Sequence, residues 1–357
     1  MKHNFWTIGQ ITICLILLAG CNASEPFPLS EPGPHQFGTQ YGFKFTDSGR
    51  EDREISLYIW YPAVLAEGTE SSKYNFDAEP DMSGAPYPVI LSSAKVGMYF
   101  GPHLASHGFV VVGVDGQDSK DHWGNWLIDY PLDQVFALEQ VAKNPPDGLQ
   151  GMIDTDHAGA TGYSFDGYNA LALSGARVDP EFYQSQCAVA VPGDPRPEEW
   201  YIDYVCNIEG GWDEFVNNAG SQITNSLDGL WQPLTDPRVR ASLPMAPEGA
   251  WLFGDRGLAA VDRPILIIAA TADDINYYDL EAVYIYENLG VTEKSMISFI
   301  DQDHMMIMND EQLKVMKHLA AAFFGYHLQN KQDYEKFFSE EYISRQDDLA
   351  WGVYAGE

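Results

Sequence analysis

The chain has 357 residues, of which 45% are hydrophobic and 20% are charged, so it is neither a disordered nor a fibrous sequence. Its length allows one large α/β domain or two small ones, each with a full core. The formal net charge of −32 at pH 7 repels nucleic-acid phosphates and anionic lipid headgroups, which excludes nucleic acid as an expected partner.

The first residues are typical of an export signal. A basic residue precedes an apolar run from Ile8 to Leu18, and the first acid appears only at Glu25. This run is shorter than the roughly 20 residues of a membrane-spanning helix. The letters Leu-Ala-Gly-Cys that end at Cys21 resemble the lipobox of bacterial lipoproteins, whose cysteine becomes the lipidated first residue. We therefore expect residues 1–21 to be a lipoprotein-type signal, with lipidation at Cys21 rather than ordinary cleavage nearby.

A tether is expected directly after this signal. Residues 22–36 are rich in proline, and such segments are stiff and do not build a core. They would hold the following domain off a membrane. Asn22, next to the cysteine, favours the outer membrane by analogy with such lipoproteins, so the predicted location is the bacterial cell envelope, outside the cytoplasm.

Strand-like and helix-like runs alternate over residues 37–329. Two early runs, 39–46 and 54–61, are typical of antiparallel edge strands. Continuously apolar runs, typical of strands buried on both faces of a parallel sheet, follow at 88–93, 109–114 and 264–270, and a last alternating strand is expected at 294–300. Helical spacing occurs at 99–107, 131–143 and 308–327. The alternation predicts an α/β fold with a mostly parallel central sheet and helices on both faces.

Residues 180–237 interrupt this rhythm, and we expect them to form an inserted lid over the carboxyl edge of the sheet. Their Trp and Tyr residues could line an acyl or polymer groove, or could supply the core of the lid itself. The insertion contains Cys187 and Cys206, which would form a disulfide in an oxidising compartment; two buried free thiols are the alternative. The tail, 330–357, is acidic and aromatic and has no predicted function.

The functional hypothesis starts from Ser164, which lies in the motif Gly-Tyr-Ser-Phe-Asp-Gly at 162–167. An apolar strand-like run precedes this motif and a helix-like run follows it. A strand, a sharp turn with a serine and a helix are typical of the nucleophile elbow of serine hydrolases. Ser164 is therefore the candidate nucleophile, although Asp166 stands where the usual pattern Gly-x-Ser-x-Gly has its second glycine.

Two further candidates follow strands later in the chain. Asp273 comes after the run 264–270, and His304 comes after the run 294–300. Because the carboxyl ends of parallel strands share one edge, these side chains are expected near Ser164, in the chain order serine, acid, histidine. The histidine would take the serine proton, and the carboxylate would hold the histidine in the required tautomer. Asp274 is the alternative acid, and for either aspartate a helix cap is the alternative role.

Backbone N–H groups are also needed to stabilise the oxyanion. They usually come from the residue after the nucleophile and from a turn after an early strand, which here are Phe165 and Val96. No metal or cofactor is expected. His103 and His107 have the helical spacing of zinc ligands, but Leu104 stands where a metalloprotease would carry its glutamate, and helix packing explains the two histidines better.

Together these segments, over about 39–327, resemble the dienelactone hydrolase-like and plasma-type platelet-activating-factor acetylhydrolase-like branch of the α/β-hydrolase superfamily. The elbow of that branch usually reads Gly-His-Ser-Phe-Gly-Gly. Ser164 and Phe165 match it, whereas Tyr163 and Asp166 depart from it. The resemblance implies an α/β-hydrolase fold and hydrolysis of short or oxidised acyl esters, small or lipid-like, through an acyl-enzyme and without metal.

The oxyanion turn of that branch usually reads Ser-His-Gly-Leu-Gly. Ser93 and Gly97 match it and Val96 takes the place of the leucine, but Ala94 and Lys95 replace His-Gly. These departures and the aspartate of the elbow could narrow the substrate range or silence the site. The alternative hypothesis is therefore a non-catalytic surface lipoprotein that binds a glycan, polymer or lipid. Attack on an amide or a thioester would use the same site.

Overall fold

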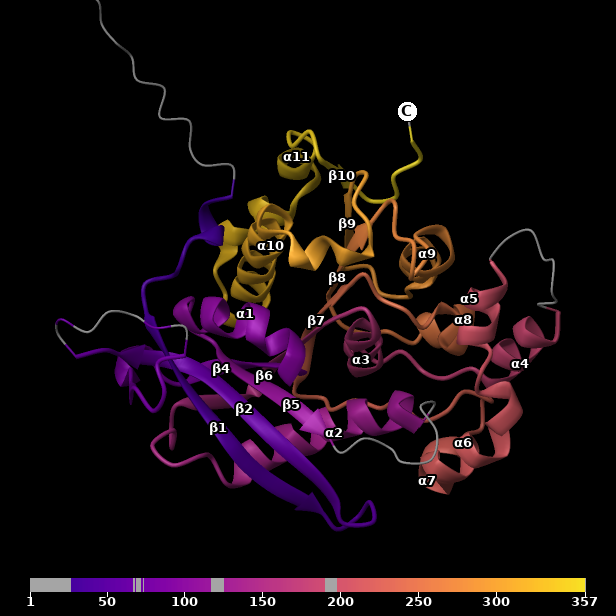
Figure 1. The fold of residues 1–357 in the computed structure, drawn as a ribbon, viewed down its shortest axis with the longest axis horizontal. Helices are drawn as coiled ribbons and strands as arrows, with labels where there is room; N and C mark the ends of the chain where they lie inside the picture. The colour runs from indigo at the N-terminus through magenta and orange to yellow at the C-terminus, as the bar shows by residue number, and fades with distance from the viewer. Residues whose placement is uncertain are drawn as a thin grey trace, which may run out of the picture.

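The computed structural model describes residues 27–356, apart from 67, 69–71, 73, 117–124 and 190–197 (Figure 1). The predicted signal, Cys21 and the first part of the predicted tether lie outside these residues. Among the helices that are described, none is both long enough and apolar enough to cross a membrane.

A single mixed sheet of ten strands organises the described chain, in the order β1-β2-β5-β4-β6-β7-β8-β9-β10, with β3 paired to β2. The strands from β5 to β9 in this order run parallel, and antiparallel pairs complete the two edges. The predicted α/β class with a mostly parallel central sheet is confirmed. The strands are β1 (Gln36–Asp47), β2 (Arg53–Val64), β3 (Glu79–Pro80), β4 (Tyr87–Ser93), β5 (Val110–Gly116), β6 (Ile153–Tyr163), β7 (Val239–Met245), β8 (Ile265–Ala270), β9 (Lys294–Phe299) and β10 (Leu349–Trp351).

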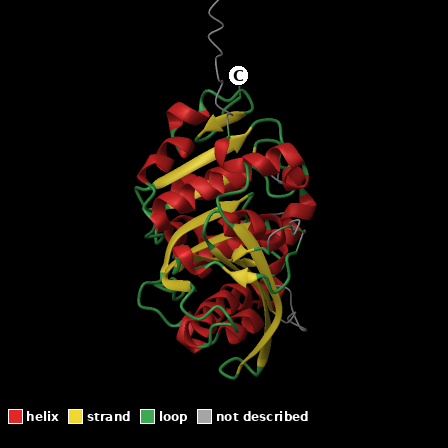
Figure 2. Ribbon diagram, turned by 90° about the vertical axis from the view of Figure 1, so that its left-hand side faces the viewer, coloured by secondary structure: helices red, strands yellow, loops and turns green. Residues whose placement is uncertain are grey.

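Helices cover both faces of this sheet (Figure 2). One face packs against α1 and α10, and the other packs against α2, α3, α8 and α9. The α-helices are α1 (Ala94–Ser106), α2 (Trp126–Lys143), α3 (Phe165–Leu173), α4 (Pro180–Val189), α5 (Glu199–Val205), α6 (Trp212–Ala219), α7 (Ser221–Thr224), α8 (Ala250–Leu258), α9 (Tyr284–Asn288), α10 (Asp310–Gln329) and α11 (Glu340–Ile343). Short 3-10 turns are η1 (Pro28–Ser30), η2 (Met82–Gly84), η4 (Glu209–Gly211), η6 (His304–Met308) and η7 (Gln332–Phe338), and η5 (Asp279–Val283) is a π-helical turn.

The central strands are apolar throughout because both of their faces are buried. In β4, Ile90 packs with the α1 and α10 side, whereas Val89 and Leu91 pack on the opposite side. In β8, Leu266 and Ile267 divide between the two faces in the same way. Each fully buried aliphatic side chain contributes about 1.5–3 kcal/mol, so these strands hold the two helical layers together.

Both ends of the described chain pack onto this core. In the part of the predicted tether that is described, the Leu29 amide donates to His318 of α10 at 3.0 Å, and the Gly33 amide donates to Ser106 Oγ at 2.8 Å. The tether expectation is therefore corrected for this part, because hydrogen bonds dock it on the domain. In the tail, β10 extends the sheet by pairing with β9, with Leu349 opposite Phe299.

The insertion at 180–237 forms α4 to α7 and joins the core on the α3 and α8 side (Figure 1). Its aromatic residues mainly pack on one another, since Tyr183 stacks on Trp212 and Phe215 stacks on Trp231. These four side chains supply the core of the insertion, as one of the two alternative interpretations expects.

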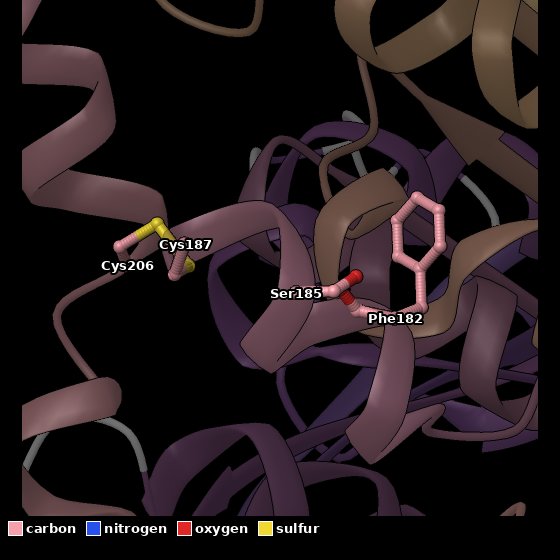
Figure 3. Close-up of a disulfide and its surroundings, with 4 residues drawn as sticks. All are labelled: Phe182, Ser185, Cys187 and Cys206. Atoms are coloured by element: carbon pink, nitrogen blue, oxygen red, sulfur yellow. A yellow bond between two sulfur atoms is a disulfide. The ribbon is translucent and has the colours of Figure 1, made fainter. Parts of the chain in front are cut away.

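The two cysteines of the insertion are joined, as the sequence predicts (Figure 3). The disulfide Cys187–Cys206 has a Cα–Cα distance of 5.5 Å and ties α4 to the residue that ends α5. Beside it, the Ser185 hydroxyl donates to the Phe182 carbonyl at 2.8 Å.

Removing this disulfide should destabilise the protein. The cysteines are 19 residues apart, and closing a loop of that length in the unfolded chain is worth about 3 kcal/mol. We expect the double variant Cys187→Ser/Cys206→Ser to unfold at lower urea concentration, with a loss approaching that value. Wild-type protein measured with a reducing agent should match the variant. Equal midpoints for variant and oxidised wild type would contradict the prediction.

Candidate active site

Ser164 occupies a sharp turn between β6 and α3. Its φ of 60° lies in a region that costs a non-glycine residue on the order of 1–3 kcal/mol, so surrounding contacts must hold it there. The Ser164 amide donates to the Met245 carbonyl of β7 at 2.9 Å, and its carbonyl accepts from the Gly167 amide at 2.7 Å. Gly162 is required by close approach, because a Cβ there would lie 1.8 Å from the Asp166 carbonyl oxygen. The local sequence thus forms the predicted strand, turn and helix.

The structure brings Ser164, His304 and Asp273 into one hydrogen-bonded chain. The Ser164 hydroxyl and His304 Nε2 are 2.8 Å apart, and His304 Nδ1 lies 2.9 and 3.0 Å from the two Asp273 carboxylate oxygens. Asp273 and His304 are 6% and 5% exposed, so water competes little for these bonds. A carboxylate only accepts, so Nδ1 carries the proton and Nε2 presents its lone pair to the serine hydroxyl.

Local contacts hold the histidine and the acid. The Tyr163 hydroxyl donates to the His304 carbonyl at 2.7 Å, and the Asp303 side chain accepts from the Met305 amide at 2.8 Å. The turn that carries the histidine is therefore held from both sides.

Asp273, rather than Asp274, is the acid that contacts the histidine. Its Oδ1 also accepts from the Ile275 and Asn276 amides, at 3.0 and 2.8 Å. Asp273 therefore also caps the following turn, so one carboxylate has both of the expected roles, histidine partner and cap. Asp274 is exposed to solvent.

The Val96 amide already has a hydrogen-bond acceptor at the start of its own helix, which corrects its expected role as an oxyanion donor. No open loop follows β4, because α1 starts at Ala94 and Ser93 is its N-cap. The Val96 amide therefore donates to Ser93 Oγ at 3.1 Å, as the third residue of a capped helix does. Ala94 and Lys95 precede it in the same turn, and both line the cavity beside the elbow. Phe165 is the first residue of α3, where no acceptor within the helix is available to its amide.

Asp166 connects the elbow to the start of α1. Its carboxylate accepts from the Ser93 hydroxyl at 2.6 Å and from Asn169 Nδ2 at 3.2 Å. Burial raises the pKa of Asp166, while the Ser93 hydrogen bond and the charge of Lys95 oppose that rise. The Asp166 side chain thus connects the start of α3 to the start of α1 through hydrogen bonds.

A cavity of about 620 Å³ begins at the residues that follow the elbow serine. Its walls are the carboxyl ends of β4 and β5, the first turns of α1 and α3, one face of α2 and Tyr204 of the insertion. This volume is that of a small-molecule site.

Two buried glutamates were missed by the sequence analysis. The Tyr204 hydroxyl donates to Glu248 at 2.7 Å, and the Tyr201 hydroxyl donates to Glu281, so both acids fasten α5 of the insertion. Burial raises the pKa of Glu248 to about 8 and that of Glu281 to about 7. Glu248 follows β7 after two residues, and an acid just past the carboxyl end of a buried strand is a signal that could have found it.

Family comparisons supply no assignment for this site. A scan against protein-family models finds no match, and a search of the curated proteins finds none either. Within the described residues, no group of three or more His, Cys, Asp or Glu side chains is placed to hold a metal ion. His103 and His107 pack with ring centroids 4.6 Å apart, and His107 Nε2 lies 3.0 Å from the Glu31 carbonyl.

The raised pKa of Glu248 predicts a pH-dependent stability. An acid that holds its proton more tightly when folded loses stabilisation as pH rises from its ordinary 4.5 to about 8. In Glu248→Gln that titration is absent, so the fall in unfolding free energy over this range should be shallower by about 1 kcal/mol or more. Urea unfolding at several pH values measures this fall in the unfolding free energy for both proteins. The exposed Glu214→Gln is the control and should follow the wild type; an unchanged slope in Glu248→Gln would refute the assignment.

Proposed function

We propose that the protein is a serine hydrolase of the α/β-hydrolase superfamily, in the dienelactone hydrolase-like and plasma-type platelet-activating-factor acetylhydrolase-like branch, and that it cleaves carboxylic esters. The observation that carries this proposal is the hydrogen-bonded chain from Ser164 through His304 to Asp273. Three side chains of the types needed for nucleophilic catalysis meet there, in the chain order of that superfamily. The adjoining cavity offers room for a small or lipid-like ester.

In the proposed reaction each of the three side chains has one role. Ser164 Oγ attacks the acyl carbon of the ester while His304 Nε2 takes its proton, and the tetrahedral intermediate collapses when His304 gives that proton to the departing alcohol. Water then attacks the acyl-enzyme, with His304 again as the base, which releases the carboxylic acid and restores the serine hydroxyl. Asp273 stays ionised and stabilises the imidazolium in each step.

The oxyanion would be held by the amide of Phe165 and by a free amide in the first turn of α1. The Lys95 amide takes this role in place of Val96, because the latter is bonded to Ser93. Both donors are at helix N-termini, where N–H groups without helical acceptors and the helix dipole favour negative charge.

We also propose that the chain is exported and anchored in the cell envelope, in the outer membrane, through lipid on Cys21. The disulfide Cys187–Cys206 supports export, since such bonds persist in oxidising compartments and are rare in the cytosol. The lipid anchor would then bind the protein to the membrane, and the active site would bind the ester substrate.

A fluorophosphonate probe and p-nitrophenyl acetate test the hydrolase proposal. The folded wild type should be labelled, and Ser164→Ala should lose labelling and at least about 10⁴-fold in kcat. Asp273→Asn should retain the fold, and its kcat should fall on the order of 10³–10⁴-fold, because the histidine is then held in the wrong tautomer.

Ser185→Ala is the matched control, since this serine lies on α4 and bonds only a backbone carbonyl there. It should be labelled and should turn over like the wild type. A folded wild type that is neither labelled nor active on any ester would support the alternative, a binding protein without turnover.

A further inference from the structure

One face of α2 forms an aromatic wall of the cavity. Trp126, Tyr130 and Gln134 are four residues apart, so they lie on one side of the helix, and all three line the cavity. The rings of Trp126 and Tyr130 stack with centroids 5.8 Å apart, and Phe165 meets both edge-on, at 6.2 and 5.8 Å. The Trp126 and Tyr130 rings are parallel to within 11°, and the outer ring face of such a stack is apolar and electron-rich. It suits the flat C–H face of a ring-shaped ligand.

Two amide side chains of the same cavity have unused acceptors. Gln134 and Asn169 are 2% and 1% exposed, and neither Gln134 Oε1 nor Asn169 Oδ1 has a hydrogen-bond partner. The orientation of Asn169 is set by its Nδ2, which donates to the Asp166 carboxylate. A buried acceptor without a partner is unfavourable, so these two carbonyl groups indicate a ligand that carries hydrogen-bond donors.

The charges near the cavity favour neutral donors over a cation. Asp133 is already paired with Arg50 and Arg53, at 2.7 and 2.8 Å. Asp166 is satisfied by its two hydrogen bonds and by the nearby charge of Lys95, which also lines the cavity. A further carboxylate that lines the cavity, Asp115, is exposed to solvent, where water weakens its attraction for a cation. An ammonium group would find Lys95 as a neighbour and few uncompensated anions.

We propose that this cavity holds a polyhydroxylated ring, so that the esters cleaved at Ser164 are acylated carbohydrates. The assignment of these esters rests on the proposed hydrolase function; the binding of the ring does not. The sugar stacks on the wall of Trp126 and Tyr130, and its hydroxyl groups donate to Gln134 and Asn169. The ester oxygen of the sugar is the leaving group, which departs as a free hydroxyl with the proton from His304.

Two matched esters test the substrate class. One is the acetate of the primary hydroxyl of glucose, and the other is cyclohexylmethyl acetate, which has a ring of similar size without hydroxyl groups. The wild type should prefer the sugar ester by at least about tenfold in kcat/KM, because hydroxyl-free rings leave the buried carbonyls unpaired. Gln134→Met and Asn169→Leu should each lower this ratio by about tenfold.

Gln312→Met is the matched control for these variants. Gln312 Oε1 is likewise buried without a partner, but the residue is on α10 and lies outside the cavity. Its ratio should equal that of the wild type. A ratio near one in the wild type, or the same loss in Gln312→Met, would overturn the inference while leaving ester hydrolysis in place.

Binding to Ser164→Ala separates this inference from the hydrolase proposal. Calorimetric titration of that variant should show tighter binding of the sugar ester than of cyclohexylmethyl acetate. If that preference appears although the wild type hydrolyses neither ester, the sugar site stands and the hydrolase proposal fails. Preferential binding of acetylcholine would overturn the sugar site in favour of a cation site.

Discussion

The strained turn at Ser164 is the constraint on which the rest of the site depends. A serine at φ 60° exposes its hydroxyl above the sheet, and the backbone bonds to Met245 and Gly167 keep it there. The bond to Met245 depends on the parallel register of β6 and β7, which places Tyr163 opposite Met245. The sheet therefore holds the turn, and the turn determines where a histidine has to be.

His304 reaches that position because of strand order. The sheet runs β6-β7-β8-β9, so the loops after β8 and β9 leave the same edge as the elbow. Asp273 follows β8 and His304 follows β9, which brings together residues 140 positions apart in the chain. The hydroxyl of Tyr163 then fixes the histidine backbone, so one residue of the elbow strand orients its partner.

A second element provides the contacts of the Asp166 carboxylate. Asp166 would be an isolated, partly buried charge if nothing faced it, and such a charge is unfavourable. Ser93 and Asn169 provide the hydrogen bonds, and Lys95 provides a nearby positive charge. Asp166 and Lys95 thus belong to one network, which joins the start of α1 to the start of α3.

Local pattern was sufficient for most elements and for three site residues. The run 88–93 became β4 and the run 264–270 became β8 with shifts of one residue, since burial on both faces leaves a continuous apolar signal. The first residues of the helices were predicted less accurately. The helix expected from Pro131 begins at Trp126, because proline favours a first turn without requiring one, and α1 begins at Ala94, where a turn was expected.

By itself, the sequence determined the α/β class, the elbow, the disulfide pair and the three side chains that meet at the edge of the sheet, because each follows from a local pattern or from chain order. Only the tertiary structure decided that the Val96 amide donates to the helix cap Ser93, that the tail extends the sheet and that Glu248 and Glu281 fasten the insertion. Those outcomes depend on which buried groups meet across long stretches of chain. The residues next to a polar group in the sequence do not show which distant group will be its hydrogen-bond partner.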